Sequence, residues 1–155
     1  MLRNKILSFI LFFIVTFSAS FVGGLVSINL KEPWYSTLIK SNFNPPDWVF
    51  APVWTILYLM MTFAIWNFWH SKNRDMNTVY IYFIHIIINT TWSIVFFALH
   101  KIFLAMLVLI TLIIFIVLLI IRFKPVNLLS YYLMMPYLLW CSYALFLNIN
   151  LVILN

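Results

Sequence analysis

Five long apolar runs account for most of this chain and restrict it to a membrane fold. A helix that crosses the hydrocarbon core of a bilayer needs about 20 consecutive apolar residues. We expect such helices over residues 6–27, 46–69, 77–99, 103–123 and 128–154. Only 8% of the residues are charged, against about 25% in a soluble domain. The sequence therefore predicts an all-α integral membrane protein, a single domain built as a bundle of five transmembrane helices in a lipid bilayer.

The connections between the runs indicate how the helices are arranged. Those at 70–76, 100–102 and 124–127 are short, so we expect consecutive helices to be antiparallel neighbours. The connection at 28–45 is long enough to have a shape of its own. The first run follows Arg3 and Lys5 as in a signal peptide, but it is longer than the apolar region of one. We therefore expect it to be retained as the first span.

The basic residues lie singly or in pairs between the apolar runs. The net charge is +6, but a scattered distribution is typical of interfacial anchors and topology signals rather than of a nucleic-acid surface. Counting them by side of the membrane gives six against three, which favours a cytoplasmic N-terminus. The six are Arg3, Lys5, Lys72, Arg74, Arg122 and Lys124, and the three are Lys31, Lys40 and Lys101. Helical spans favour a bacterial cell membrane over an outer membrane.

Residues that would support catalysis or metal binding are scarce. The single Cys141 excludes an intrachain disulfide and a cysteine-rich metal site. The three acidic residues all fall near the ends of spans, so an ion-coupled transporter, which uses intramembrane carboxylates, is disfavoured. His85 lies within a span, where a hydrogen-bonded packing role is favoured over metal or haem ligation. We expect no required cofactor.

Polar and aromatic residues share one face in each of three spans. In the third span, His85 and the residues that follow it at intervals of 4, 3, 1 and 3 lie on one side of a helix. The second and fifth spans repeat the pattern. The sets are Trp54, Tyr58, Met61 and Ile65; His85, Asn89, Trp92, Ser93 and Phe96; and Trp140, Ala144, Leu147, Asn148 and Leu151. Two interpretations stay open: hydrogen bonds that join the helices, or a pocket for a flat, mostly apolar ligand.

Two further features concern how helices begin and pack. In the stretch 45–55, we expect Pro46 in the first helical turn and Pro52 deeper, where neighbouring helices must compensate a lost hydrogen bond. In the first span, Ala19, Gly23 and Ser27 recur every four residues. Such a stripe lets helices approach closely, either within the chain or across a dimer.

Four ordered motifs in this sequence resemble the TspO/MBR family, which comprises tryptophan-rich sensory proteins and the mitochondrial translocator protein, also called the peripheral benzodiazepine receptor. They are PWY at 33–35, PPDWVFAPVWTILY at 45–58, NTTWSIVFF at 89–97 and PYLLWCSYALFLN at 136–148. The resemblance implies a five-helix bundle, commonly a homodimer, with a pocket for porphyrins such as protoporphyrin IX and for benzodiazepine-type drugs. It also implies a lid formed by residues 28–45.

Carried onto the matching positions, the resemblance implies a specific set of ligand-binding residues. They are Trp34, Tyr35, Pro46, Trp54, Tyr58, Asn89, Trp92, Ser93, Phe96, Trp140 and Ala144. Lysines 31 and 40 are candidates to meet porphyrin propionates. The cholesterol-recognition pattern of animal members is absent from 147–153, and the third span lacks the glycine pattern of some dimer interfaces.

Three functional classes follow from these observations. The favoured one is a membrane receptor or sensor that binds tetrapyrroles, with porphyrin transport as an extension. The second is an enzyme that degrades porphyrin in the presence of light and oxygen, with tryptophans relaying electrons. A solute transporter is disfavoured, because the chain shows neither an intramembrane carboxylate nor an internal repeat.

Overall fold

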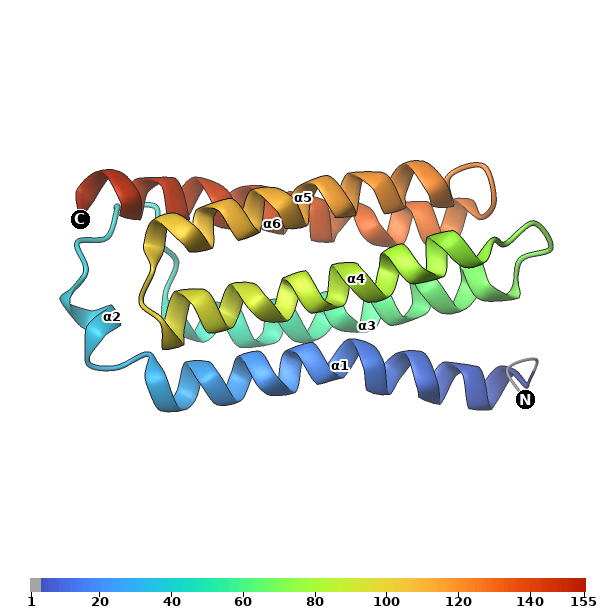
Figure 1. Ribbon diagram of the computed structural model, residues 1–155, viewed down its shortest axis with the longest axis horizontal. Coiled ribbons are helices and arrows are strands. Elements are labelled where there is room, and N and C mark those ends of the chain that lie inside the picture. Colours follow the sequence, from blue (N-terminus) through green and yellow to red (C-terminus); the bar gives the residue numbers. More distant parts are fainter. Residues whose placement is uncertain (1–3) are drawn as a thin grey trace.

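The computed structural model describes residues 4–155 and contains five long helices that run roughly parallel to one another (Figure 1). They are α1 (Lys5–Leu30), α3 (Phe50–His70), α4 (Met76–Ser93), α5 (Ile102–Phe123) and α6 (Leu128–Leu154). Three short helical segments accompany them: α2 (Trp34–Thr37), the 3₁₀ turn η1 (Asp47–Val49) and the π-helical turn η2 (Ile94–Ala98). Five helical stretches are long and apolar enough to cross a membrane. The predicted fold class is confirmed.

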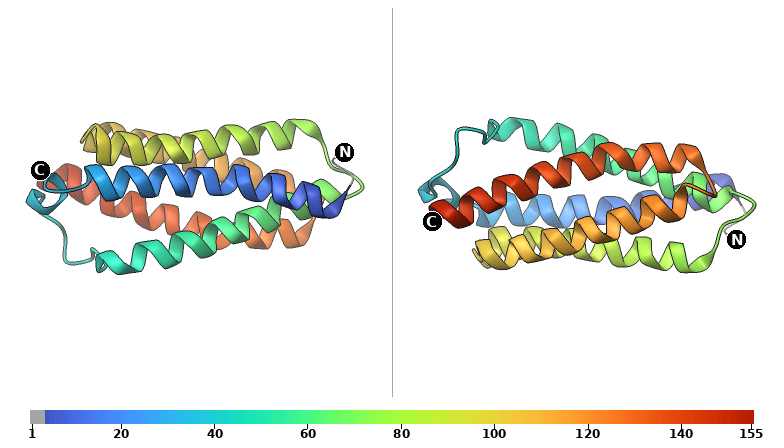
Figure 2. Two further views of the ribbon diagram at one scale, coloured as in Figure 1. Left: turned by 90° about the horizontal axis from the view of Figure 1, so that it is seen from below. Right: turned by 90° about the horizontal axis from the view of Figure 1, so that it is seen from above.

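The five helices form a closed ring rather than a simple series of hairpins. Going around the ring, the order of contacting neighbours is α1, α3, α6, α5 and α4, and α4 returns to α1. The expected pairing of consecutive helices holds for α4 with α5 and for α5 with α6, but it is wrong for α3 and α4. These two are joined by a short loop, yet α1 packs against both of them and separates most of α3 from α4 (Figure 2).

The helices that begin at one end of the bundle are capped, and those that begin at the other end are not. Asn4, Asp75 and Asn127 each accept a backbone N–H bond at the start of α1, α4 and α6. These caps satisfy donors that the first helical turn leaves free. In the described part of the chain, the starts of α3 and α5 at the opposite end have no side-chain cap.

The two prolines at the start of α3 occupy different positions from those expected. Pro46 is extended (φ −56°, ψ 142°) and immediately precedes η1 instead of lying in the first helical turn. Because η1 comes first, α3 proper begins at Phe50, and Pro52 falls in its first turn. The N–H groups of a first turn have no partner within the helix, so Pro52 needs no compensation from neighbouring helices.

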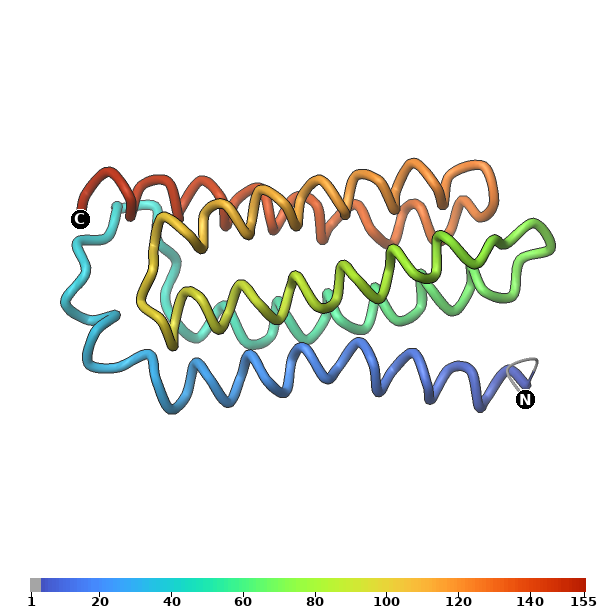
Figure 3. Tube along the Cα trace, viewed as in Figure 1, coloured from blue at the N-terminus to red at the C-terminus, as the bar shows by residue number. Residues whose placement is uncertain are grey.

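The basic residues separate by end of the bundle as the sequence indicated. Lys5, Lys72, Arg74, Arg122 and Lys124 lie where the chain makes the turns at 71–75 and 124–127, whereas Lys31, Lys40 and Lys101 lie at the end that carries α2 (Figure 3). Arg3 lies outside the described residues. The direction in which the bundle crosses the membrane stays a prediction.

Candidate functional site

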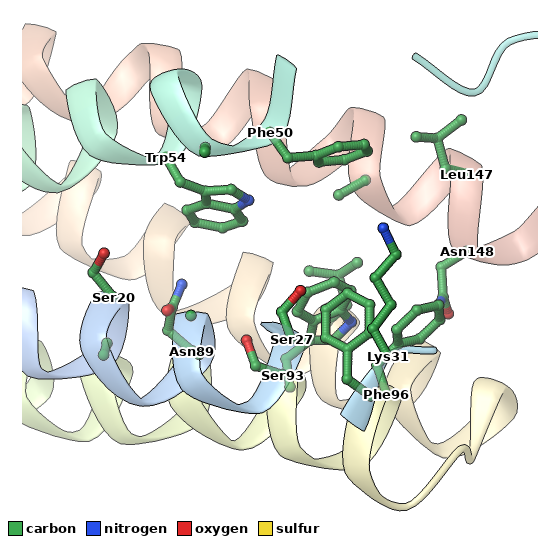
Figure 4. Close-up of a pocket in the computed structure, with 18 of the residues that line it drawn as sticks. Ser20, Ser27, Lys31, Phe50, Trp54, Asn89, Ser93, Phe96, Leu147 and Asn148 are labelled. Carbon is green, nitrogen blue, oxygen red and sulfur yellow. The ribbon is translucent and has the colours of Figure 1, made fainter. Parts of the chain in front are cut away.

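A cavity of about 360 Å³ lies inside the ring of helices, at the end that carries α2. Its volume falls within the range of about 300–1,000 Å³ that is usual for small-molecule sites. All five long helices contribute to its lining, together with the 31–47 segment. Figure 4 shows Phe50 and Trp54 of α3 facing polar side chains from α1 and α4 across this space.

Eight of the eleven ligand-binding residues expected from the sequence line this cavity. They are Tyr35, Trp54, Tyr58, Asn89, Trp92, Ser93, Phe96 and Ala144. They come from four different segments (α2, α3, α4 with η2, and α6). The residue faces predicted from helical spacing therefore converge in space. Their contact with a ligand stays a prediction.

The remaining three expected residues, Trp34, Pro46 and Trp140, lie outside the lining of the cavity. Trp34 stacks on His100, with 4.3 Å between ring centroids. Neighbouring residues on a helix point about 100° apart, and in α2 it is Tyr35 that faces inward. Pro46 is exposed in the segment before η1.

Trp140 lines a separate, shallow groove between α3 and α6, with Val53, Ile56 and Leu139 among its neighbours. The reason is that residues spaced by four along a helix rotate gradually around its axis. Trp140 and Asn148 are eight residues apart, which places them about 80° apart around the helix axis. Asn148 faces the cavity, so Trp140 is turned toward the outer groove.

Stacked aromatic pairs form two walls of the cavity. Trp54 and Tyr58 lie one turn apart on α3, with 5.5 Å between ring centroids and 28° between ring planes. Trp92 and Phe96 are stacked at 5.3 Å and 13° at the junction of α4 and η2. A π-helical turn is a local widening that often accompanies functional sites, and here it carries Phe96 and Phe97 to the cavity.

A hydrogen-bonded network closes the inner end of the cavity. The Tyr58 hydroxyl donates to Asn89 Oδ1 (2.7 Å), and Asn89 Nδ2 donates to the Tyr137 hydroxyl oxygen (2.8 Å). Tyr137 also contacts His85 Nε2 at 3.0 Å. The network supports the packing interpretation of His85. No group of three or more metal-ligating side chains occurs within residues 4–155.

The mouth of the cavity carries the charged groups. Lys31, at the end of α1, forms an ion pair with Asp47 of η1. The Nζ atoms of Lys31 and Lys40 lie 4.5 and 4.1 Å from the centre of the Tyr35 ring, distances typical of cation–π contacts. Burial raises the pKa of the Tyr35 hydroxyl, so this ring stays neutral between the two ammonium groups.

The cavity also opens sideways between α1 and α3. Three of its lining residues (Ile28 of α1, with Ala51 and Thr55 of α3) are exposed on the surface of the bundle. Figure 2 shows these two helices diverging toward the end that carries α2. In a membrane this side of the bundle faces the bilayer.

The contribution of α1 to the cavity was missed by the sequence analysis. The small residues Ala19, Gly23 and Ser27 face inward, where they line the cavity. A Cβ atom at Gly23 would lie 2.9 Å from Ser93 Oγ of α4, so the stripe has the intramolecular packing role. Its four-residue period was the signal that could have placed α1 beside the site.

Comparisons with known proteins agree with the architecture. The sequence model of the TspO/MBR family matches residues 10–154. A tryptophan-rich protein TspO of Chlorobaculum tepidum is 33% identical to this chain and is covered over 99% of both chains. Protein CrtK of Rhodobacter capsulatus is 28% identical over 95% of this chain and 92% of its own. A tryptophan-rich sensory protein of Cereibacter sphaeroides is 30% identical over 80% of this chain and 78% of its own.

Proposed function

This chain belongs to the TspO/MBR family of sensory and translocator proteins, and from that premise we propose that it binds protoporphyrin IX and related tetrapyrroles in the cavity beneath α2. The chain is a multi-pass integral membrane protein of a bacterial membrane, and its family membership supports a role as a membrane receptor or sensor. Binding would occupy the cavity and change the state of the segment above it.

The aromatic walls are the observation that carries this proposal. The Trp54–Tyr58 and Trp92–Phe96 pairs offer flat, apolar surfaces on two sides of one space. Burial of apolar surface contributes about 25 cal/mol per Å², so a few hundred Å² of macrocycle suffice for micromolar affinity after the cost of association. The same surfaces suit the fused rings of benzodiazepine-type ligands.

The charged mouth supplies a place for the acidic side chains of a porphyrin. Lys31 lines the cavity and is directed across it in Figure 4, next to its partner Asp47. A porphyrin propionate that reaches this point would compete with Asp47 for the ammonium group. The connection between α1 and η1, predicted from the sequence to be a lid over 28–45, would then change its contacts when ligand binds, which is how occupancy can be signalled.

Two tryptophans provide a matched test of the binding site. Trp54→Leu removes a ring from the cavity wall, whereas Trp140→Leu removes one from the outer groove. Titration of protoporphyrin IX, followed by its visible absorption, should show about tenfold weaker binding for Trp54→Leu, because about 1.4 kcal/mol of stacking and burial is lost. Trp140→Leu should bind like the wild type. Equal affinity of all three proteins would exclude this cavity as the site.

A second candidate function is light- and oxygen-dependent breakdown of the bound porphyrin. Its supporting observation is that the Trp54 ring, in the cavity wall, lies 6.2 Å from the Tyr137 ring, whose hydroxyl contacts His85. Photoexcited porphyrin can take an electron from Trp54 and pass it to O2 as superoxide, which is then the oxidant for the macrocycle. Tyr137 can replace the electron that Trp54 lost, with the phenolic proton passing to His85. Illumination of the complex in air should then produce a bilin-like absorption that is lost in Tyr137→Phe. If the absorption never forms, the binding proposal stands alone.

The proposal extends to transport and to self-association. Passage of porphyrin across or within the bilayer would appear as flux into proteoliposomes.

We also propose that the protein forms a homodimer. Since Gly23 of the small-residue stripe packs against α4, the dimer would use a different surface, and cross-linking in membranes would reveal it.

A further inference from the structure

Two side chains in the cavity have buried polar atoms without a hydrogen-bonding partner in the described part of the protein. Both polar atoms of the Asn148 carboxamide (Oδ1 and Nδ2) are in this position, and so is Nε1 of Trp92. Asn148 is 2% exposed and lines the cavity. Figure 4 shows its side chain extending inward from α6. Asn148 and Trp92 come from helices on different sides of the same space.

Three other asparagines in the long helices have hydrogen-bonding partners that Asn148 lacks. Asn89 is bonded to two tyrosines. Asn67 and Asn150 donate to carbonyls one turn earlier in their own helices, at 2.7 and 2.8 Å. A buried amide that makes neither kind of bond is costly. A polar group that stays buried at such a cost needs a partner, and the cavity is where that partner can come from.

The chemistry of a carboxamide defines what this partner must be. Asn148 presents one acceptor and one N–H₂ donor side by side. A group that satisfies both at once carries a donor next to an acceptor: a lactam, a cis-amide or a neutral carboxylic acid, each of which closes a ring of two hydrogen bonds. A ketone, an ether or an ionised carboxylate has no donor for Oδ1. Trp92 Nε1 offers a further unpartnered donor in the same cavity.

We propose that Asn148 anchors the ligand by a paired hydrogen bond to an amide-like or carboxylic acid edge, so that the natural ligand is a flat molecule that carries such a group. This inference rests on the proposed function, because it takes the cavity to be the ligand site, and it names the group by which the ligand is recognised. The apolar walls determine the shape of the ligand, and Asn148 determines its orientation.

Two pairs of probes distinguish the sources of this group. The first pair is 2-quinolinone, a flat lactam, and its N-methyl derivative, which lacks the N–H. The second is protoporphyrin IX and its dimethyl ester, which lacks the acid. Calorimetric titration of the detergent-solubilised protein should show the unmodified member of at least one pair binding about tenfold more tightly than its blocked partner. The pair whose preference depends on Asn148 identifies the source, because Lys31 at the mouth also favours an ionised propionate over its ester.

Substitution of the anchor connects this preference to Asn148. In Asn148→Leu, which keeps the size of the side chain, the tenfold preference should disappear. In Asn150→Leu, on the same helix but bonded to its own backbone, it should remain. Thermal unfolding checks that both variants fold, and we expect Asn148→Leu to be at least as stable as the wild type, because it removes unpaired buried polar atoms.

The possible results separate this inference from the proposed function. If neither pair discriminates in the wild type, or if every preference survives in Asn148→Leu, the anchor is excluded. If protoporphyrin IX binds in that case, the proposed function still holds. If protoporphyrin IX does not bind but the lactam preference depends on Asn148, the anchor is supported and the tetrapyrrole proposal fails.

Discussion

The half of the bundle near the turns at 71–75 and 124–127 is filled by large side chains, whereas the half beneath α2 encloses the cavity. In the first half, Phe68 and Phe123 are fully buried, with 4.9 Å between ring centroids. The helix starts at that end are capped, and those at the cavity end are not. Packing and caps stabilise one half, and the other half keeps an internal cavity.

The side chains of α1 show how one helix serves both halves. Its first half carries Phe9, Phe12, Phe13 and Phe17, which make ring contacts with one another or with neighbouring helices. Its second half presents small residues to the interior, among them Gly23 and Ser27. Large rings fill the space between helices, and small residues leave it open.

The largest effect on stability is expected in the filled half. Phe68→Ala should lower the free energy of unfolding by about 3–5 kcal/mol, because it leaves a cavity among fully buried neighbours. Phe50→Ala, at the partly exposed wall of the cavity, should cost roughly 1 kcal/mol. Reversible unfolding in mixed detergent micelles measures both. Equal losses would contradict the comparison of the two halves.

The next largest effect is expected at the boundary between the halves. Tyr137→Phe removes the hydroxyl that joins Asn89 to His85. Because two buried polar groups lose a partner, the free energy of unfolding should fall by about 1–3 kcal/mol. Tyr132→Phe, at a position that is 63% exposed, is the control and should be neutral. A neutral Tyr137→Phe would mean that the network does not stabilise the inner end of the cavity.

A smaller, pH-dependent effect is expected at the cap of α4. Burial raises the pKa of Asp75, but hydrogen bonds from the backbone and hydroxyl of Thr78, together with nearby Arg122, outweigh it and lower the pKa below 3.8. The carboxylate therefore stabilises the fold above pH 3.8, and that contribution is lost as the pH falls through the lowered pKa. At neutral pH, Asp75→Ala should cost about 1 kcal/mol.

The free energy of unfolding of Asp75→Ala and of the wild type, measured from neutral pH to below pH 3.8, tests the effect. The difference between the two proteins should shrink below pH 3.8. A difference that does not change with pH would show that the charge of the cap is not what stabilises α4. Asn127→Ala is a suitable control, because that cap is an uncharged amide.

The smallest effect is expected at two neighbouring glycines of α1. A Cβ atom at Gly24 meets nothing within 4 Å, so Gly24→Ala should raise stability by about 0.5–1 kcal/mol through helix propensity. Gly23→Ala should lose this gain to the contact with Ser93 Oγ. Adding Ser93→Ala should restore it. A gain for Gly23→Ala alone would show that the Ser93 side chain moves aside freely.

The sequence alone identified the five spans and most of the inward faces. The apolar runs are long and uninterrupted, and the bounds of the spans follow from them to within a few residues, except at the start of α3, where η1 delays the helix. Helical spacing selected Trp54, Asn89 and Ala144 correctly as residues of one interior space. These features are local, because the period of a helix determines which residues share a face.

Only the tertiary structure decided which faces meet. Periodicity does not say which helix lies opposite a given face, so the insertion of α1 between α3 and α4 and the separate groove of Trp140 were not visible in the sequence. The partners of polar side chains are decided in the same way. Helical spacing placed both Asn89 and Asn148 on inward faces, yet Asn89 is hydrogen-bonded to two tyrosines and Asn148 lines the cavity. Hydrogen bonds form between groups that packing brings within about 3 Å, and packing is a property of the whole bundle.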